Sequence, residues 1–138
     1  MRILAVDPGS KRIGLAISDG TGSIANPLAV INHISRPADA ATVADIAKTN
    51  NAGLIVVGQS LDDDGNPTFE GRRAGRFAAA LMTQIGLPVV FWDESLTTQD
   101  ARAARIAMGV SRKNRSGHLD SLAASVLLQS YLDANPQK

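Results

Sequence analysis

The sequence predicts one α/β domain built on a mixed sheet of five strands, three of them antiparallel and two parallel. Three short apolar runs fall within the first 32 residues. Turn-forming residues separate them, and they lie too close together for parallel crossovers, which need about a dozen residues or more. Continuous apolar runs then alternate with segments of helical periodicity, which is the pattern of βα units with parallel strands. No linker, repeat or break in composition divides the chain, so residues 1–138 are expected to form a single domain.

The expected elements follow in order along the chain. The strands, all short apolar runs bounded by turn residues, are expected at residues 2–7, 13–18, 28–32, 54–57 and 88–92. The helices, all with apolar positions at helical spacing, are expected at residues 38–50, 74–85, 97–108 and 119–134. The last two strands are continuously apolar, as in strands buried on both faces. Gly86 is expected to stop the second helix, and Asn135-Pro136 the last.

Composition narrows the class of protein. Hydrophobic residues make up 44% of the chain and charged residues 20%, which suits a domain with a real core. The absence of cysteine excludes a disulfide framework, a thiolate zinc site and a cysteine nucleophile. Asp7 and Pro8 interrupt the first apolar run, whereas a membrane span needs roughly 18 or more apolar residues. We therefore expect a soluble, cytoplasmic protein that does not enter membranes.

Three carboxylates stand where ligands bind in open α/β sheets, beyond the carboxyl ends of strands. Asp7 ends the first strand, Glu94 follows the fifth, and Asp120 falls in the first turn of the last helix. Taken singly, Asp7 is an ordinary turn residue, and the other two suit solvated ends of elements. Together they are expected to converge as hard oxygen ligands for Mg²⁺ or Mn²⁺. Two such ions about 3.5–4 Å apart would support phosphodiester hydrolysis.

Basic residues are unevenly distributed. Five of the 14 basic residues lie in residues 101–119, which contain no acid, so the rest of the chain has a net charge of −4. Such a segment either docks phosphate groups or is simply a solvated loop. The candidate nucleic-acid-binding residues, chosen for their place near the expected site, are Lys11, Arg12, Arg72, Arg73, Arg76, Arg112, Lys113 and Arg115. Trp92 is expected in the core, and His118 borders Asp120.

Five blocks of sequence, in order and over nearly the whole chain, resemble the YqgF family of Holliday-junction-resolvase-like proteins. They are LAVDPGSKRIGLAISD, IVVGQSLDDDG, RAGRFAAAL, DESLTT and DSLAASVLLQSY. The resemblance implies a ribonuclease H-like fold and a metal-dependent nuclease that trims the 5′ end of precursor 16S rRNA, with resolution of branched DNA as the older proposal. The family's three acids fall on Asp7, Glu94 and Asp120. Ser95 stands where the family usually has arginine, and Gly58-Gln59-Ser60 where it has Gly-Leu-Pro.

Two other classes of function remain open at this point. A phosphotransferase or ATPase would use the first strand-turn-strand as a phosphate loop, but actin-like kinases need two such domains. A non-catalytic nucleic-acid-binding module would use the basic loop and gain nothing from three acids beside phosphate. The expected partner is nucleic acid, either precursor rRNA or branched DNA, with an assembling ribosomal particle as a further candidate. A resolvase would act as a homodimer, whereas a trimming nuclease can be a monomer.

Overall fold

The computed structural model describes residues 1–94 and 117–137, with side chains of the second range described from Asp120 onward. Five strands form one sheet in the order β3-β2-β1-β4-β5. They are β1 (Arg2–Pro8), β2 (Arg12–Ser18), β3 (Ala25–Asn32), β4 (Ala52–Gln59) and β5 (Val89–Asp93). β2 pairs antiparallel with both β1 and β3, whereas β1, β4 and β5 are parallel. The predicted mixed sheet is confirmed.

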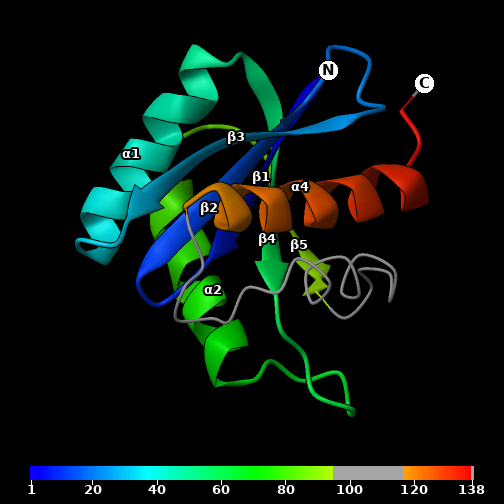
Figure 1. Ribbon diagram of the computed structural model, residues 1–138. Helices are drawn as coiled ribbons and strands as arrows, with labels where there is room; N and C mark the ends of the chain where they lie inside the picture. The colour runs from blue at the N-terminus through cyan, green and yellow to red at the C-terminus, as the bar shows by residue number, and fades with distance from the viewer. Residues whose placement is uncertain (95–116, 138) are drawn as a thin grey trace.

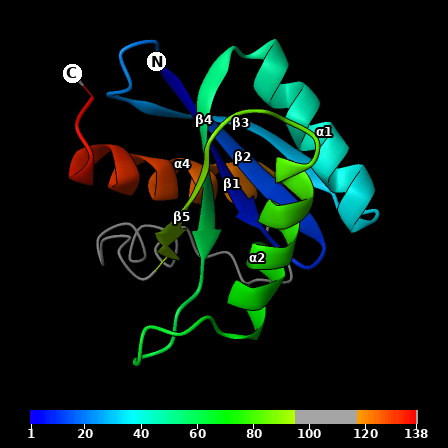
Figure 2. The ribbon, with the colours of Figure 1, turned by 180° about the vertical axis from the view of Figure 1, so that it is seen from behind.

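Helices cover both faces of this sheet (Figures 1 and 2). α1 (Arg36–Thr49) and α2 (Phe69–Met82) lie on one face, and α4 (Gly117–Ala134) crosses the other. Side chains alternate along the central strand β1 and divide the core in two. Leu4 and Val6 belong to the core under α1 and α2, and Ile3 and Ala5 belong to the core under α4. All four are fully buried, so β1 is the rigid centre on which both layers rest.

Hydrogen bonds at the helix ends explain where the helices begin. The hydroxyl of Ser35 accepts from the N–H of Ala38, and α1 starts with proline in its first turn. Thr68 caps α2 by accepting from the N–H of Gly71, so this helix begins five residues before the predicted start. The apolar stripe that led to the prediction begins only at Ala74, because Gly71 is the only buried residue of α2 before it.

Two expectations about the second half of the chain were wrong. α2 ends at Met82 and not near Gly86, because the Thr83 hydroxyl donates to the carbonyl of Ala80 and closes the last turn. β5 is half-buried and not buried on both faces, and Phe91 is 40% exposed, because among the described residues no strand pairs with the outer edge of β5. The helix expected at 97–108 lies outside the described residues.

Other details follow the predictions. α4 ends before Asn135, whose N–H donates to the carbonyl of Tyr131. Trp92 packs in the core under α4, with its ring edge-on to that of Tyr131 at 5.3 Å between centroids. None of the helices over residues 1–94 and 117–137 is long and apolar enough to cross a membrane. Both chain ends lie at the end of the sheet opposite the carboxyl ends of β1 and β4 (Figure 1).

Candidate active site

Asp7 lies near the carboxyl end of β1, on the face of the sheet that α4 covers. The odd-numbered residues before it belong to the core under α4, and side chains alternate along a strand, so Asp7 is on that same face. Its partner in the antiparallel pairing with β2 is Gly14. On the other side, Val6 pairs with Val57 of β4, which brings Gly58 beside Asp7. Each strand that neighbours Asp7 therefore presents a glycine.

Gly14 permits the first turn of α4 to rest directly on the sheet. A Cβ at this position would lie 2.2 Å from the backbone oxygen of Asp120, far inside van der Waals contact. Any side chain would therefore push the helix away from β2. Because Gly14 pairs with Asp7, this close approach brings the start of α4 to the side of Asp7, and sequence positions from opposite ends of the chain become neighbours.

The carboxylate of Asp120 is held by an ion pair. The Nε of Arg12, at the start of β2, lies 2.8 Å from Oδ2 of Asp120. The side chains are 35% and 16% exposed, respectively. Asp120 also stands in the first turn of α4, where the positive end of the helix dipole favours a carboxylate. The last helix is thus tied electrostatically to the first hairpin.

Glu94 reaches the same face from the other side. It follows β5, whose Trp92 pairs with Gly58. A Cβ on Gly58 would lie 3.0 Å from the Oε1 of Glu94 and 2.8 Å from a methyl carbon of Leu127 on α4. The carboxylate of Glu94 therefore lies over Gly58, between β4 and α4. The three predicted acids share one face of the sheet, with Asp7 between the other two.

This arrangement supplies the ligand types of a magnesium or manganese site, since carboxylate oxygens are the hard donors these ions prefer. The two glycines let Asp120 and Glu94 approach the strands closely, because the backbone of Asp120 and the side chain of Glu94 lie where a Cβ would otherwise project. Within residues 1–94 and 117–137, however, no three His, Asp or Glu side chains are gathered closely enough to hold an ion. The three carboxylates are of the chemical type that such a metal prefers. One of them, that of Asp120, is ion-paired with Arg12.

The predicted basic residues divide between the two faces. Arg12 is at the acids, and Lys11 is exposed in the adjoining turn. The α2 group, consisting of Arg72, Arg73 and Arg76, lies across the sheet from α4, so the structure does not bring these three to the acids. Arg73 pairs with Glu70 at 3.2 Å. Arg112, Lys113 and Arg115 lie outside the described residues, and the side chain of His118 is likewise undescribed.

Gly14 and Gly58 are the functional positions that sequence reasoning missed. Both interrupt strands of otherwise apolar residues. A glycine inside a strand is a known signal for close approach of another backbone or a ligand, so the signal was present. What could not be read from the sequence was the identity of the approaching groups, which are the backbone of Asp120 and the side chain of Glu94.

The fold is shared with resolvases of the ribonuclease H-like class. The structure of RuvC from Thermus thermophilus aligns with a TM-score of 0.62 at 19% identity, covering 100% of this chain and 99% of that one. The same enzyme in complex with Holliday junction substrate aligns with a TM-score of 0.60 at 17% identity, covering 100% and 98%. The fowlpox virus Holliday junction resolvase gives 0.57 at 19% identity, covering 97% and 99%.

The sequence itself narrows the class to one family. The pattern of the RuvX family, described as Holliday junction resolvase, matches residues 1–134. A relative from Syntrophus aciditrophicus is 41% identical over 138 residues, covering 100% of this chain and 92% of its own length. A relative from Thermoanaerobacter pseudethanolicus is 37% identical over 139 residues, with full coverage of both chains. Both carry the provisional name of pre-16S rRNA nucleases. The chain belongs to the RuvX family.

Proposed function

We propose that this protein is a divalent-metal-dependent nuclease that hydrolyses phosphodiester bonds and processes the 5′ end of precursor 16S rRNA. The observation that carries the proposal is the placement of Asp7, Glu94 and Asp120 on one face of the sheet, over the two strand glycines. The family and the names of its full-length relatives support a nuclease. The proposal of precursor rRNA as the substrate rests on those names. If rRNA is the substrate, we further propose an assembling ribosomal particle as a partner and a cytoplasmic location.

The three acids would hold Mg²⁺ or Mn²⁺, in one or two positions. When bound, the metal would supply an activated water and stabilise the leaving oxygen. Asp7, at the centre, is the residue able to contribute to both sides of the site. Arg12 neutralises Asp120 in the structure described here. Exchange of this guanidinium from carboxylate to a phosphate oxygen would bring substrate to the acids, because guanidinium binds both groups through the same donor geometry.

Lys11 and Arg12 would contact the backbone of the nucleic acid at the mouth of this site. Arg112, Lys113 and Arg115 are proposed to hold the strand further along, as their sequence position just before α4 suggests. Arg72, Arg73 and Arg76 lie across the sheet and are assigned no part in cleavage. Loss of each phosphate contact should reduce the slope of log affinity against log salt by roughly one unit.

The test is cleavage of two labelled substrates, a precursor 16S rRNA 5′ fragment and a four-way DNA junction. Each is incubated with Mg²⁺ or Mn²⁺ and, separately, with EDTA. Asp7→Asn and Glu94→Gln are expected to abolish cutting without loss of fold. Asp93→Asn is the matched control, because Asp93 neighbours Glu94 in sequence but alternation places it on the other face of β5. Cleavage that survives EDTA or Asp7→Asn contradicts the metal-dependent mechanism.

Resolution of branched DNA is the second candidate. It is favoured by the alignment, over the whole chain, with a RuvC structure determined on a Holliday junction substrate. Cutting of the junction alone, by a protein that sediments as a dimer, would place this function first. Cutting of the rRNA fragment by a monomer would remove it. Binding of both substrates with no cleavage of either, with or without metal, would identify a binding module.

A further inference from the structure

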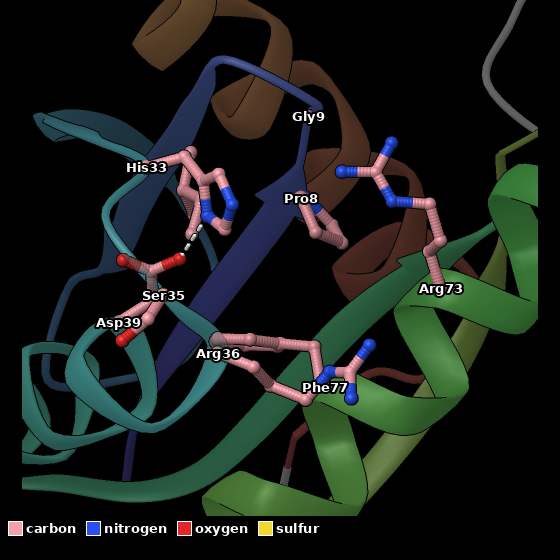
Figure 3. Close-up of a pocket in the computed structure, with 9 residues that line it drawn as sticks. Pro8, Gly9, His33, Ser35, Arg36, Asp39, Arg73 and Phe77 are labelled. Atoms are coloured by element: carbon pink, nitrogen blue, oxygen red, sulfur yellow. Dashed lines mark hydrogen bonds and ion pairs between the residues drawn. The ribbon is translucent and has the colours of Figure 1, made fainter.

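A pocket of about 370 Å³ opens on the face of the sheet opposite the three acids (Figure 3). One wall is apolar and is formed by Pro8, Ile13 and Phe77. The rim carries His33, Arg36 and Arg73, which come from the end of β3, the start of α1 and the first half of α2. Ligand pockets of proteins commonly measure about 300–1,000 Å³, so this one suits a small molecule of roughly one nucleotide.

The acidic side chain that lines the pocket, Asp39, is already engaged in hydrogen bonds. Asp39 is only 3% exposed, and both of its carboxylate oxygens have partners. Its Oδ2 accepts from Nδ1 of His33 at 2.5 Å, the interaction dashed in Figure 3, and its Oδ1 accepts from the N–H of Ile34 at 3.0 Å. This carboxylate therefore orients the histidine ring and the start of α1, and both of its oxygens already have hydrogen-bond partners within the protein.

The two arginines at the rim are less fully engaged than Asp39. Arg36 makes no ion pair or side-chain hydrogen bond within residues 1–94 and 117–137. Arg73 pairs at 3.2 Å with Glu70, whose side chain is 57% exposed, and such a surface pair exchanges partners at little cost. The pocket also lies at the start of α1, a helix of 14 residues whose dipole adds positive potential there.

From this we infer that the pocket binds a nucleotide through its phosphate monoester, with the nucleoside against the apolar wall. A phosphate monoester carries a charge of about −1.5 to −2 near neutral pH, which two arginines at one rim would neutralise. The apolar lining suits the base, because bases are bound by apolar and aromatic surfaces. The ligand source is either the phosphorylated end of a nucleic-acid strand or a free mononucleotide. Neither requires the cleavage proposed above, so the inference stands apart from it.

The experiment is an NMR titration of the ¹⁵N-labelled full chain in EDTA, where metal-dependent cutting is excluded. The probes are uridine 5′-monophosphate, uridine, ribose 5-phosphate, and a short RNA with either a 5′-phosphate or a 5′-hydroxyl. We expect the monophosphate or the 5′-phosphorylated RNA to shift the amide signals of Gly9 and Ile13. Arg36→Ala should weaken that binding at least about tenfold, because a charge-assisted contact is lost. Asp7→Asn should leave it unchanged.

Lys48→Ala is the matched control, since it removes the same charge from the opposite, exposed end of α1. Binding of the free monophosphate and of the 5′-phosphorylated RNA both support the site, and the tighter one identifies the source. Equal affinity for uridine and its monophosphate would overturn phosphate recognition, and equal affinity for ribose 5-phosphate would overturn recognition of a nucleotide. An affinity unchanged by Arg36→Ala, or lowered equally by Lys48→Ala, would also refute the inference.

Discussion

Replacement of Gly14 by alanine tests whether α4 is seated on the sheet as described. A Cβ at this position would meet the backbone oxygen of Asp120 at 2.2 Å and its carbonyl carbon at 2.8 Å. These are backbone atoms, so no side chain can rotate away to relieve the contact. The first turn of α4 must instead move outward, which stretches the ion pair between Arg12 and Asp120 and opens the core under the helix.

The magnitude follows from two opposing effects. In a compatible backbone conformation, glycine to alanine stabilises a protein by about 0.4–1 kcal/mol, because the unfolded chain loses freedom. Overfilling a packed site costs about 1–3 kcal/mol. Because the clash involves backbone, the second effect should dominate, and we expect Gly14→Ala to lower the free energy of unfolding by about 1–3 kcal/mol. For a chain of this length each kcal/mol corresponds to roughly 3–5 °C in the melting temperature.

The assay is urea and thermal unfolding followed by far-UV circular dichroism, with Gly20→Ala as the matched control. A Cβ at Gly20 would have nothing within 4 Å, so that variant should match or slightly exceed the parent in stability. Under the proposed function, Gly14→Ala should also lose more cleavage activity than its stability loss explains, because Asp120 is displaced. If Gly14→Ala is as stable as Gly20→Ala, α4 does not rest on β2 as described.

Three further predictions concern the same layer and one loop. In Gly58→Ala the atoms nearest to the new methyl group belong to the side chains of Leu127 and Glu94 and not to the backbone, so we expect a smaller stability loss than in Gly14→Ala, about 1 kcal/mol, and weaker Mn²⁺ binding by calorimetry. Arg12→Ala removes the cation that is paired with the Asp120 carboxylate, so Mn²⁺ should bind more tightly. The free energy of unfolding should fall by about 1 kcal/mol or less, because the ion pair is partly exposed. Hydrogen bonds from a nearby threonine hydroxyl and from backbone N–H groups lower the pKa of Asp19 from 3.8 to about 2. The ionised carboxylate therefore stabilises the folded state above pH 4, and this stabilisation is lost as the pH falls through 2. Asp19→Ala should therefore lower the melting temperature at pH 7 by more than at pH 2, with Asp63→Ala, in another loop, as the control.

Each of these three has an outcome that would contradict it. A large stability loss in Gly58→Ala would mean that the space above β4 is rigidly filled. Unchanged or weaker Mn²⁺ binding by Arg12→Ala would show that the arginine does not compete with metal for Asp120. A melting-temperature difference for Asp19→Ala that persists at pH 2 would place the effect of that substitution in packing and not in charge.

The acids of the candidate site could be predicted because the signal for each is local. Asp7 ends an apolar run, Glu94 follows another, and Asp120 opens a helical stripe. The carboxyl ends of parallel strands meet at one edge of a sheet, so the topology predicts that Asp7 and Glu94 lie close together, and side-chain alternation sets the face that they share. The pairing of Arg12 with Asp120, by contrast, joins the first hairpin to the last helix and depends on the exact seat of α4. Sequence predicted Arg12 as a phosphate ligand and gave no sign of its carboxylate partner.

The pocket across the sheet was missed for a similar reason. No sequence motif links His33 to Asp39, and Asp39 is expected only as part of the helix over residues 38–50. Their contact arises because β3 ends where α1 begins, and the turn between them folds the histidine back over the first turn of the helix. The start of α2 was misplaced because its first turn is largely exposed, and apolar periodicity marks the buried stripe of a helix and not its capped end.

The packing of Asp120 against the first hairpin has a consequence for the order in which the candidate site assembles during synthesis. Strands β1 to β3 leave the ribosome before α4, which supplies Asp120, covers one face of the sheet and follows all five strands in the sequence. Until that helix docks, Asp7 has only part of its surroundings and the apolar face beside it is open to water. A nascent chain therefore holds all three acids only after α4 has been made. The candidate site is completed when this helix docks on the sheet.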